Sequence, residues 1–292
     1  MAIRKVFTFL FCCSLVVSCG KKASDVVNTS TNETIVQDTV VLNEENFPDE
    51  NFRAMVCYLF DAKEGDSILS DRFAEVEQLR MRDFGLNNLK GIEYFVSLKK
   101  LQCIDNFLTE IDLSKNIALE YLECGKNQLT SINLTHNPKL VGLGCSCNQL
   151  TNIDVSKNPE LQILLCDENM LETIDVSNNP QLRELAVNEC KLKELDVSKN
   201  LKLEQLLCNK NQFKELDLSK NTSLNYVFCE QPYMEHVNIT YPAGKSDIGK
   251  ETNRMLSNFL SLSWNSPLYD IKLIRQKVGL SCDTAVAPHE VQ

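Results

Sequence analysis

The sequence predicts a repeat solenoid that is mainly β in structure. The first observation is an uninterrupted period of 21 residues between residues 101 and 230, and the second is a leucine at the same place in nearly every period. The third is the alternation of inward apolar residues with outward ones around each leucine, which is typical of a short strand. A fixed period near 20 residues predicts stacked coils that share one continuous core.

Each period carries an apolar residue, a cysteine, an asparagine and a second apolar residue at fixed spacing, as in Leu122, Cys124, Asn127 and Leu129. Alternation turns Leu122 and Cys124 to one face of a strand and Glu123 to the other. Stacked coils then place these strands side by side at roughly 4.8 Å in a parallel sheet. The asparagine falls where the chain leaves the strand, so its amide can satisfy buried backbone groups of its own coil and the next one.

A second pattern, apolar-x-apolar ending in asparagine, follows ten residues later in each period, as in Ile132 to Asn137. Only about seven residues separate Ile132 from Leu140, which leaves no room for a helix. We therefore expect two short strands per coil on opposite walls, the second of them extended or strand-like.

This repeat resembles that of leucine-rich-repeat proteins, in a short bacterial variety with a 21-residue period, and the resemblance covers about half of the chain. It implies an arc whose concave wall carries the parallel sheet and binds the ligand. The segments 46–52 and 91–95 resemble the amino-terminal cap of surface leucine-rich-repeat proteins from host-associated anaerobes.

A column of inward cysteines invites a disulfide or metal interpretation, but we expect free core thiols. Side chains stacked in parallel register face the wrong way for a disulfide dihedral, and Val187 occupies one place in the column. No histidine interleaves the column and no Cys-x-x-Cys occurs, so we predict no metal. The column comprises Cys103, Cys124, Cys145, Cys166, Cys208 and Cys229.

Residues 1–18 predict a signal peptide, with Arg4 and Lys5 before an apolar run too short to span a bilayer. The run ends in Ser18-Cys19-Gly20, which resembles a bacterial lipobox and implies a lipid anchor on Cys19. The alternative is an ordinary signal peptide followed by a chance cysteine. No aspartate follows Cys19, so the resemblance points to the outer membrane, with the cell surface as the expected face.

Residues 19–42 are expected to comprise the lipidated cysteine and a flexible tether. The tether is predicted because this segment is rich in Ser, Thr, Asn and Val without helical periodicity. Residues 43–78 predict a small helical cap, in which Pro48 opens a helix through about Phe60. A further short helix is expected through Val76, capped by Ser70.

The segment 61–72 resembles a calcium-binding loop, but it departs at the ligands. Lys63 and Gly65 stand at ligand positions and Arg72 replaces the bidentate acid, so we expect no calcium there. The repeats are predicted to span residues 79–240, with Ile239 in a last half coil. Residues 241–292 are expected to form an irregular cap and tail.

A formal charge of −10 argues against nucleic acid and anionic lipid headgroups as partners. His136, His236 and His289 lie in unrelated contexts and no nucleophile motif occurs, so we predict no catalysis and no cofactor. An outward aspartate column on the convex wall, accompanied by lysines three residues on, invites a calcium interpretation. We read it as a charge-compensated turn column instead.

The outward positions of the concave wall form the predicted ligand-binding surface, since several are more apolar than solvent requires. Between Tyr121 on one side and Ile163 with Leu165 on the other, we expect glycines to leave the strand backbone accessible to a ligand side chain; this is the predicted bare floor of the site. The alternatives are that strand propensity filled these sites, or that the carboxy-terminal cap covers the last two. The predicted site residues are Tyr121, Glu123, Gly142, Gly144, Ile163, Leu165, Asp167, Leu207, Tyr226 and Phe228.

The sequence thus predicts a monomeric, lipid-anchored protein that binds a host or envelope protein without catalysis. One alternative is a periplasmic scaffold of the envelope, and another is an enzyme or effector activity in residues 241–292.

Overall fold

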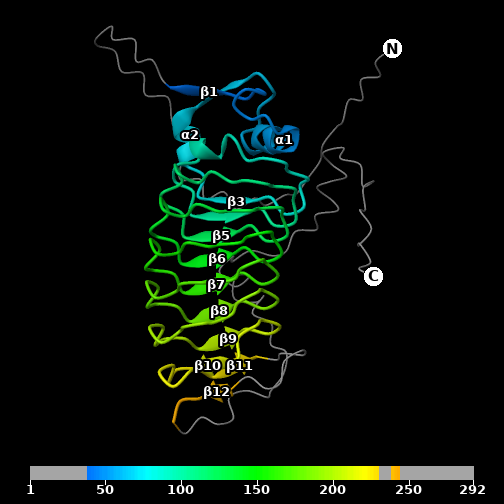
Figure 1. Cartoon of the computed structure of the whole chain (residues 1–292). Helices are drawn as coiled ribbons and strands as arrows, with labels where there is room; N and C mark the ends of the chain where they lie inside the picture. The colour runs from blue at the N-terminus through cyan, green and yellow to red at the C-terminus, as the bar shows by residue number, and fades with distance from the viewer. Residues whose placement is uncertain (1–37, 230–237, 244–292) are drawn as a thin grey trace, which may run out of the picture.

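The protein is a stack of coils with a small helical cap at its amino-terminal end (Figure 1). The structure, a computed structural model, describes residues 38–229 and 238–243. The predicted signal peptide, Cys19 and the segment 244–292 lie outside the described residues. Within the described part of the chain, no helix is long and apolar enough to cross a membrane.

The core of the repeat is an eight-stranded parallel sheet in the order β11-β9-β8-β7-β6-β5-β4-β3. Neighbouring strands pair leucine to leucine, as Leu101 does with Leu122 and Leu122 with Leu143. The predicted solenoid with a parallel sheet is therefore confirmed. The strands are β3 (Gln78–Arg80), β4 (Lys100–Gln102), β5 (Tyr121–Glu123), β6 (Gly142–Gly144), β7 (Ile163–Leu165), β8 (Glu184–Ala186), β9 (Gln205–Leu207) and β11 (Tyr226–Phe228).

The second half of each coil is extended, as predicted, but it forms a ladder only at the last described coil. There β10 (Glu215–Asp217) pairs in parallel with β12 (Asn238–Thr240), and Ile239 packs against the core. The expectation of two strands in every coil is wrong. In the other coils, asparagine amides bind convex-wall carbonyls, as the Nδ2 of Asn137 does to Leu113 O at 3.1 Å.

The amino-terminal cap closes the first coil with an aromatic cluster. Helix α1 (Glu50–Leu59) begins after Asp49, whose Oδ1 accepts a hydrogen bond from Phe52 N at 2.9 Å, so Pro48 precedes the cap residue. The Oδ2 of Asp49 also accepts from Asn87 N at 2.7 Å, which ties the helix to the first coil. The cluster comprises Phe47, Phe52, Phe60, Phe73, Tyr94 and Phe95, with η1 (Ile92–Tyr94) supplying one of its rings.

The structure corrects two cap predictions. Strand β1 (Thr39–Val41) falls inside the predicted tether and pairs with β2 (Ser67–Leu69), because Val40 and Ile68 join the core on one face of this two-stranded antiparallel sheet. The segment 61–72, which resembles a calcium-binding loop, thus contains β2. Ser70 is the first residue of α2 (Ser70–Ala74) and makes no side-chain cap bond, so it is not the predicted helix cap.

Most of the cysteine column lies in the core, and the described cysteines form no disulfide. Cys103, Cys124, Cys145, Cys166 and Cys208 are buried, and Cys229 is partly exposed at the end of the column. Burial raises the pKa of the Cys124 thiol to about 12. The column therefore packs as small apolar groups, because the reactive thiolate is disfavoured.

Candidate functional site

The predicted site residues lie on one wall of the solenoid, at the outward positions of β5 to β11. In this wall Phe228 is 39% exposed, whereas Tyr121, Leu165, Asp167, Leu207 and Tyr226 are half-buried. The remaining four, Glu123, Gly142, Gly144 and Ile163, are buried.

The expected bare floor at Gly142 and Gly144 is wrong. Both glycines face outward on β6, but they are buried, and in register they lie between Tyr121 and Glu123 on one side and Ile163 and Leu165 on the other. Strands about 4.8 Å apart bring larger side chains next to a glycine, so missing Cβ atoms do not guarantee access. The accessible apolar surface lies at Tyr121 and along Leu165, Leu207, Tyr226 and Phe228.

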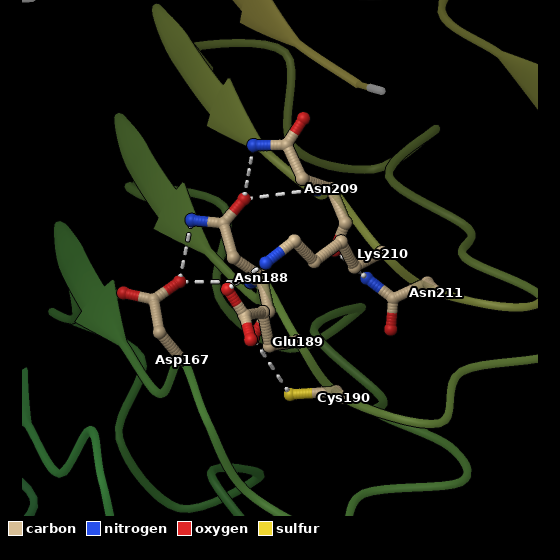
Figure 2. A network of polar contacts seen from close by, with 7 residues as sticks. All are labelled: Asp167, Asn188, Glu189, Cys190, Asn209, Lys210 and Asn211. Atoms are coloured by element: carbon tan, nitrogen blue, oxygen red, sulfur yellow. Dashed lines mark hydrogen bonds and ion pairs between the residues drawn. The ribbon is translucent and has the colours of Figure 1, made fainter. Parts of the chain in front are cut away.

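A polar ladder runs along the rim where the strands end (Figure 2). The Oδ1 of Asp167 accepts hydrogen bonds from the backbone N and the Nδ2 of Asn188, at 2.8 and 2.7 Å. The Oδ1 of Asn188 accepts the same pair from Asn209, again at 2.8 and 2.7 Å. Each amide therefore fixes the next coil, and the outer rim is rigid at this end of the wall.

Burial raises the pKa of the Asp167 carboxyl, against the lowering effect of the hydrogen bonds from Asn188 and Ser146. The polar ladder lies beside Cys190, which replaces the turn asparagine in its coil (Figure 2). The Cys190 Sγ lies 3.5 Å from Cys166 O and from Asn188 O, so a weak thiol donor stands in for the amide. An ion pair between Glu189 and Lys210, 2.6 Å long, joins the coil of Cys190 to the following coil.

The amino-terminal half of the wall carries its own contacts. The Nζ of Lys100 lies 5.2 Å from the centre of the Tyr121 ring, and burial lowers the pKa of this lysine. A carboxylate oxygen of Glu123 accepts a hydrogen bond from the side chain of Gln102. Tyr121 is thus held by a cation–π contact, which fixes the ring at the edge of the predicted contact region.

Glu184 is the residue that the sequence analysis left out of the site. It faces outward on β8, yet it is 3% exposed, and its Oε2 has no hydrogen-bond partner. Burial, followed by the nearby Glu204 carboxylate, raises the pKa of Glu184 to about 7. The signal available in the sequence was a lone acid between Ile163 and Gln205 in one outward column.

The convex aspartates act on their own turns. The Oδ1 of Asp154 accepts from Ser156 N at 2.9 Å, and the same contact recurs in the other coils that carry the aspartate. Hydrogen bonds from the backbone and the side chain of the serine two residues on lower the pKa of each aspartate, with lysine a smaller cause where one contributes. The column comprises Asp112, Asp154, Asp175, Asp196 and Asp217, and no group of three or more metal-binding side chains occurs in the described residues.

A polar hollow of about 300 Å³ lies where β7, β8 and β9 begin, lined by Gln162, Gln181, Arg183, Lys202, Glu204 and Ser223. Its charged groups are engaged within it: Arg183 Nε donates to Glu204 Oε1 at 2.9 Å, and Lys202 donates to Gln181. His136 is exposed and contacts the Thr135 hydroxyl, while His236 and His289 lie outside the described residues.

Comparison with known proteins finds similarity to internalins of Listeria monocytogenes. Internalin J is 34% identical over 70 residues, which is 24% of this chain but only 8% of internalin J. The crystal structure of an internalin, InlF, matches 64% of this chain and 57% of its own, with 25% identity and a TM-score of 0.56. Internalin C2 matches 72% of this chain and 99% of its own, with 19% identity and a TM-score of 0.58.

No family model matches the chain. The chain spans less than two thirds of the length of internalin J and of InlF, so the comparison concerns the repeats. Internalin C2, at 19% identity, adds the fold alone. The described chain has a leucine-rich-repeat fold, and its repeats are similar to those of the internalins.

Proposed function

We propose that this protein is a non-catalytic, lipid-anchored leucine-rich-repeat protein that binds a protein ligand through its concave wall. The observation that carries the proposal is the row of accessible apolar residues on β7, β9 and β11, which comprises Leu165, Leu207, Tyr226 and Phe228. Outward apolar and aromatic side chains on a regular sheet are what a protein interface uses as anchors. Solenoids commonly bind along such extended walls.

The rigidity of the wall supports the same function. The polar ladder at Asp167, Asn188 and Asn209 and the ion pair between Glu189 and Lys210 join successive coils beside the apolar row. A rigid surface loses little conformational entropy when it binds, so its contacts add more to affinity.

The proposed anchor is Cys19, at the end of a signal peptide covering residues 1–18. Residues 20–37 would then separate the first strand from the membrane, with the outer membrane of a bacterium as the location and the cell surface as the face. Replacing Cys19 by Ala should release the protein from the membrane fraction. Partition of this variant into detergent micelles like the parent protein would contradict the anchor.

The binding proposal is tested with the soluble Cys19→Ala protein as bait and with variants on each wall. Once a partner has been captured, Tyr121→Ala or Leu165→Ala should weaken binding by about 1–2 kcal/mol, or roughly 5- to 30-fold in Kd. The melting temperature should stay nearly unchanged, because both side chains are only half-buried.

The matched controls are Asp154→Ala and Lys157→Ala, both exposed on the convex side. If both concave variants bind like the parent while the convex changes abolish binding, the assignment to the concave wall fails. Protease treatment of intact cells then tests the surface location: a protected protein would favour a periplasmic scaffold.

A further inference from the structure

Three carboxylates stand at outward positions of the described concave wall, and they differ in their partners. Glu123 accepts a hydrogen bond from Gln102, and Asp167 accepts two from Asn188. Glu184 is 3% exposed, and its Oε2 has none. A buried carboxylate oxygen without a hydrogen bond is costly in a folded protein, so this group calls for a functional explanation.

The neighbours of Glu184 do not supply a cation to that oxygen. In the sheet register it lies between Ile163 on β7 and Gln205 on β9, with Ala186 two residues on along the same strand. The adjacent Arg183 binds Glu204 through both Nε and an Nη atom. Glu184 is therefore an acceptor whose register neighbours are an apolar and a neutral side chain, with the Arg183–Glu204 ion pair nearby.

We infer that Glu184 is the recognition point for a basic side chain, a lysine or an arginine, presented by the protein ligand of the concave wall. This inference rests on the proposed function and names the chemistry of its partner. A recessed carboxylate is reached by a long side chain rather than by a flat surface. The half-buried Gln205 can turn aside to admit it, and the aliphatic stem of lysine or arginine can then pack against Ile163 and Ala186.

Metal binding is the less favoured use of the same oxygen. The described residues contain no group of three or more metal-binding side chains, and the register neighbours of Glu184 offer an apolar group and an amide. An ammonium or guanidinium group needs only the one carboxylate and brings its own hydrogen-bond donors.

The charge state of Glu184 gives the inference a pH signature. Its pKa is about 7, raised by burial and by Glu204 before β9, and partly lowered by Arg183 before β8; β7 faces it with the uncharged Ile163. A cation binds the ionised form. Since the ionised fraction rises from roughly a tenth at about pH 6 to roughly nine tenths at about pH 8, the apparent affinity should strengthen about tenfold over this interval.

The experiment uses the full-length Cys19→Ala protein and three acetylated, amidated alanine pentapeptides that carry lysine, arginine or norleucine at the centre. Binding is followed by titration calorimetry or by chemical-shift changes. The lysine and arginine peptides should bind at least about tenfold more tightly than the norleucine peptide at pH near 8, and less tightly as the pH falls. Glu184→Gln should remove both the preference for a cation and the pH dependence.

The matched control is Glu215→Gln, which removes an exposed carboxylate from β10 on the other wall and should leave peptide binding unchanged. Equal binding of the lysine and norleucine peptides, equal binding by Glu184→Gln, or no binding of any peptide would overturn the inference.

Failure here can be told apart from failure of the proposed function. If a captured protein partner depends on Tyr121 and Leu165 but is indifferent to Glu184→Gln, the concave wall binds and the basic-residue site is wrong. If the partner ignores all three changes, the concave binding function itself is wrong.

Discussion

Each coil turns twice, and the two turns solve the same problem in opposite ways. Both place a buried asparagine at the bend, in a concave-side column represented by Asn148 and a convex-side column represented by Asn158. The Nδ2 of Asn148 donates to Cys124 O and Cys145 O at 3.1 and 2.9 Å, and its Oδ1 accepts from Leu129 N at 3.0 Å. The Nδ2 of Asn158 donates to Leu134 O and Asn137 O at 3.2 and 2.9 Å, but its Oδ1 has no partner.

The backbone differs in the opposite sense. The residue before the concave-side asparagine, or before Cys190 where it takes the place of the asparagine, has a positive φ in six successive coils, whereas no described residue of the turns that carry a convex-side asparagine does. These six are Asp105, Lys126, Cys147, Glu168, Glu189 and Lys210, with φ between 50 and 62°. A left-handed conformation is unfavourable for such residues. The concave turn therefore has a strained backbone and an asparagine whose side-chain oxygen and nitrogen are both hydrogen-bonded. The convex turn has an unstrained backbone and an asparagine whose side-chain oxygen has no partner.

The comparison teaches which column fixes the coil geometry. A strained backbone persists only where its surroundings hold it, and the concave asparagine binds both its own turn and the preceding coil. Because the concave sheet carries the proposed binding wall, this column also fixes the spacing of the binding residues. The convex column can leave its acceptor unpaired, since its turn is already a relaxed one.

The largest expected effect is at the concave column. Asn148→Ala should lower the free energy of unfolding by about 2–4 kcal/mol, because it leaves the buried Leu129 N–H without a partner and removes one of the two amide donors on Cys124 O and on Cys145 O. Chemical denaturation measures this. The exposed neighbour Gln149→Ala should change stability by less than about 0.5 kcal/mol. A loss at Asn148 no larger than that of the control would remove the basis of the comparison.

The convex column should be more tolerant. Asn158→Ala loses two donor contacts but also removes an unpaired buried oxygen, so we expect a loss of about 1–2 kcal/mol, measured in the same way. Lys157→Ala, exposed beside it, serves as the control. A loss at Asn158 equal to that at Asn148 would show that the unpaired oxygen is unimportant and that the two columns are equivalent.

Cys190 offers a gain-of-stability test, since it is the natural exception in the concave column. Cys190→Asn should raise the free energy of unfolding by about 1 kcal/mol, because an amide can reproduce the contacts that Asn211 makes in the next coil. The variant should also make Asn188→Ala less damaging, since the polar ladder then no longer helps to hold a weakened turn. If the effects of Cys190→Asn and Asn188→Ala on stability are additive, the polar ladder does not compensate for the cysteine at position 190.

The smallest effect concerns the strained backbone. Lys126 is exposed with a φ of 52°, so Lys126→Gly should stabilise by about 0.5–1 kcal/mol, whereas Lys126→Ala should not. Thermal unfolding of the pair measures the difference. A glycine variant no more stable than the alanine variant would show that the surroundings already relieve the strain.

The sequence by itself determined the fold, the register of the sheet and the inward columns. The reason is physical: in a solenoid the neighbour of each residue is its own equivalent one period away, so a 21-residue period encodes the leucine ladder and the asparagine contacts together. The thiol column and the outward row followed from the same alternation. One detail was off, since each asparagine binds its own coil and the preceding one rather than the next.

Only the tertiary structure decided the features that break the period. Strand β1 joins the cap because its pairing with Ser67–Leu69 is a contact between distant segments, which no local pattern carries. The burial of Gly142 and Gly144 and the raised pKa of Glu184 depend on which side chains happen to flank them across the sheet. Periodicity fixes where an outward residue points, whereas access and charge state depend on the sizes and charges of its unlike neighbours, which differ from coil to coil.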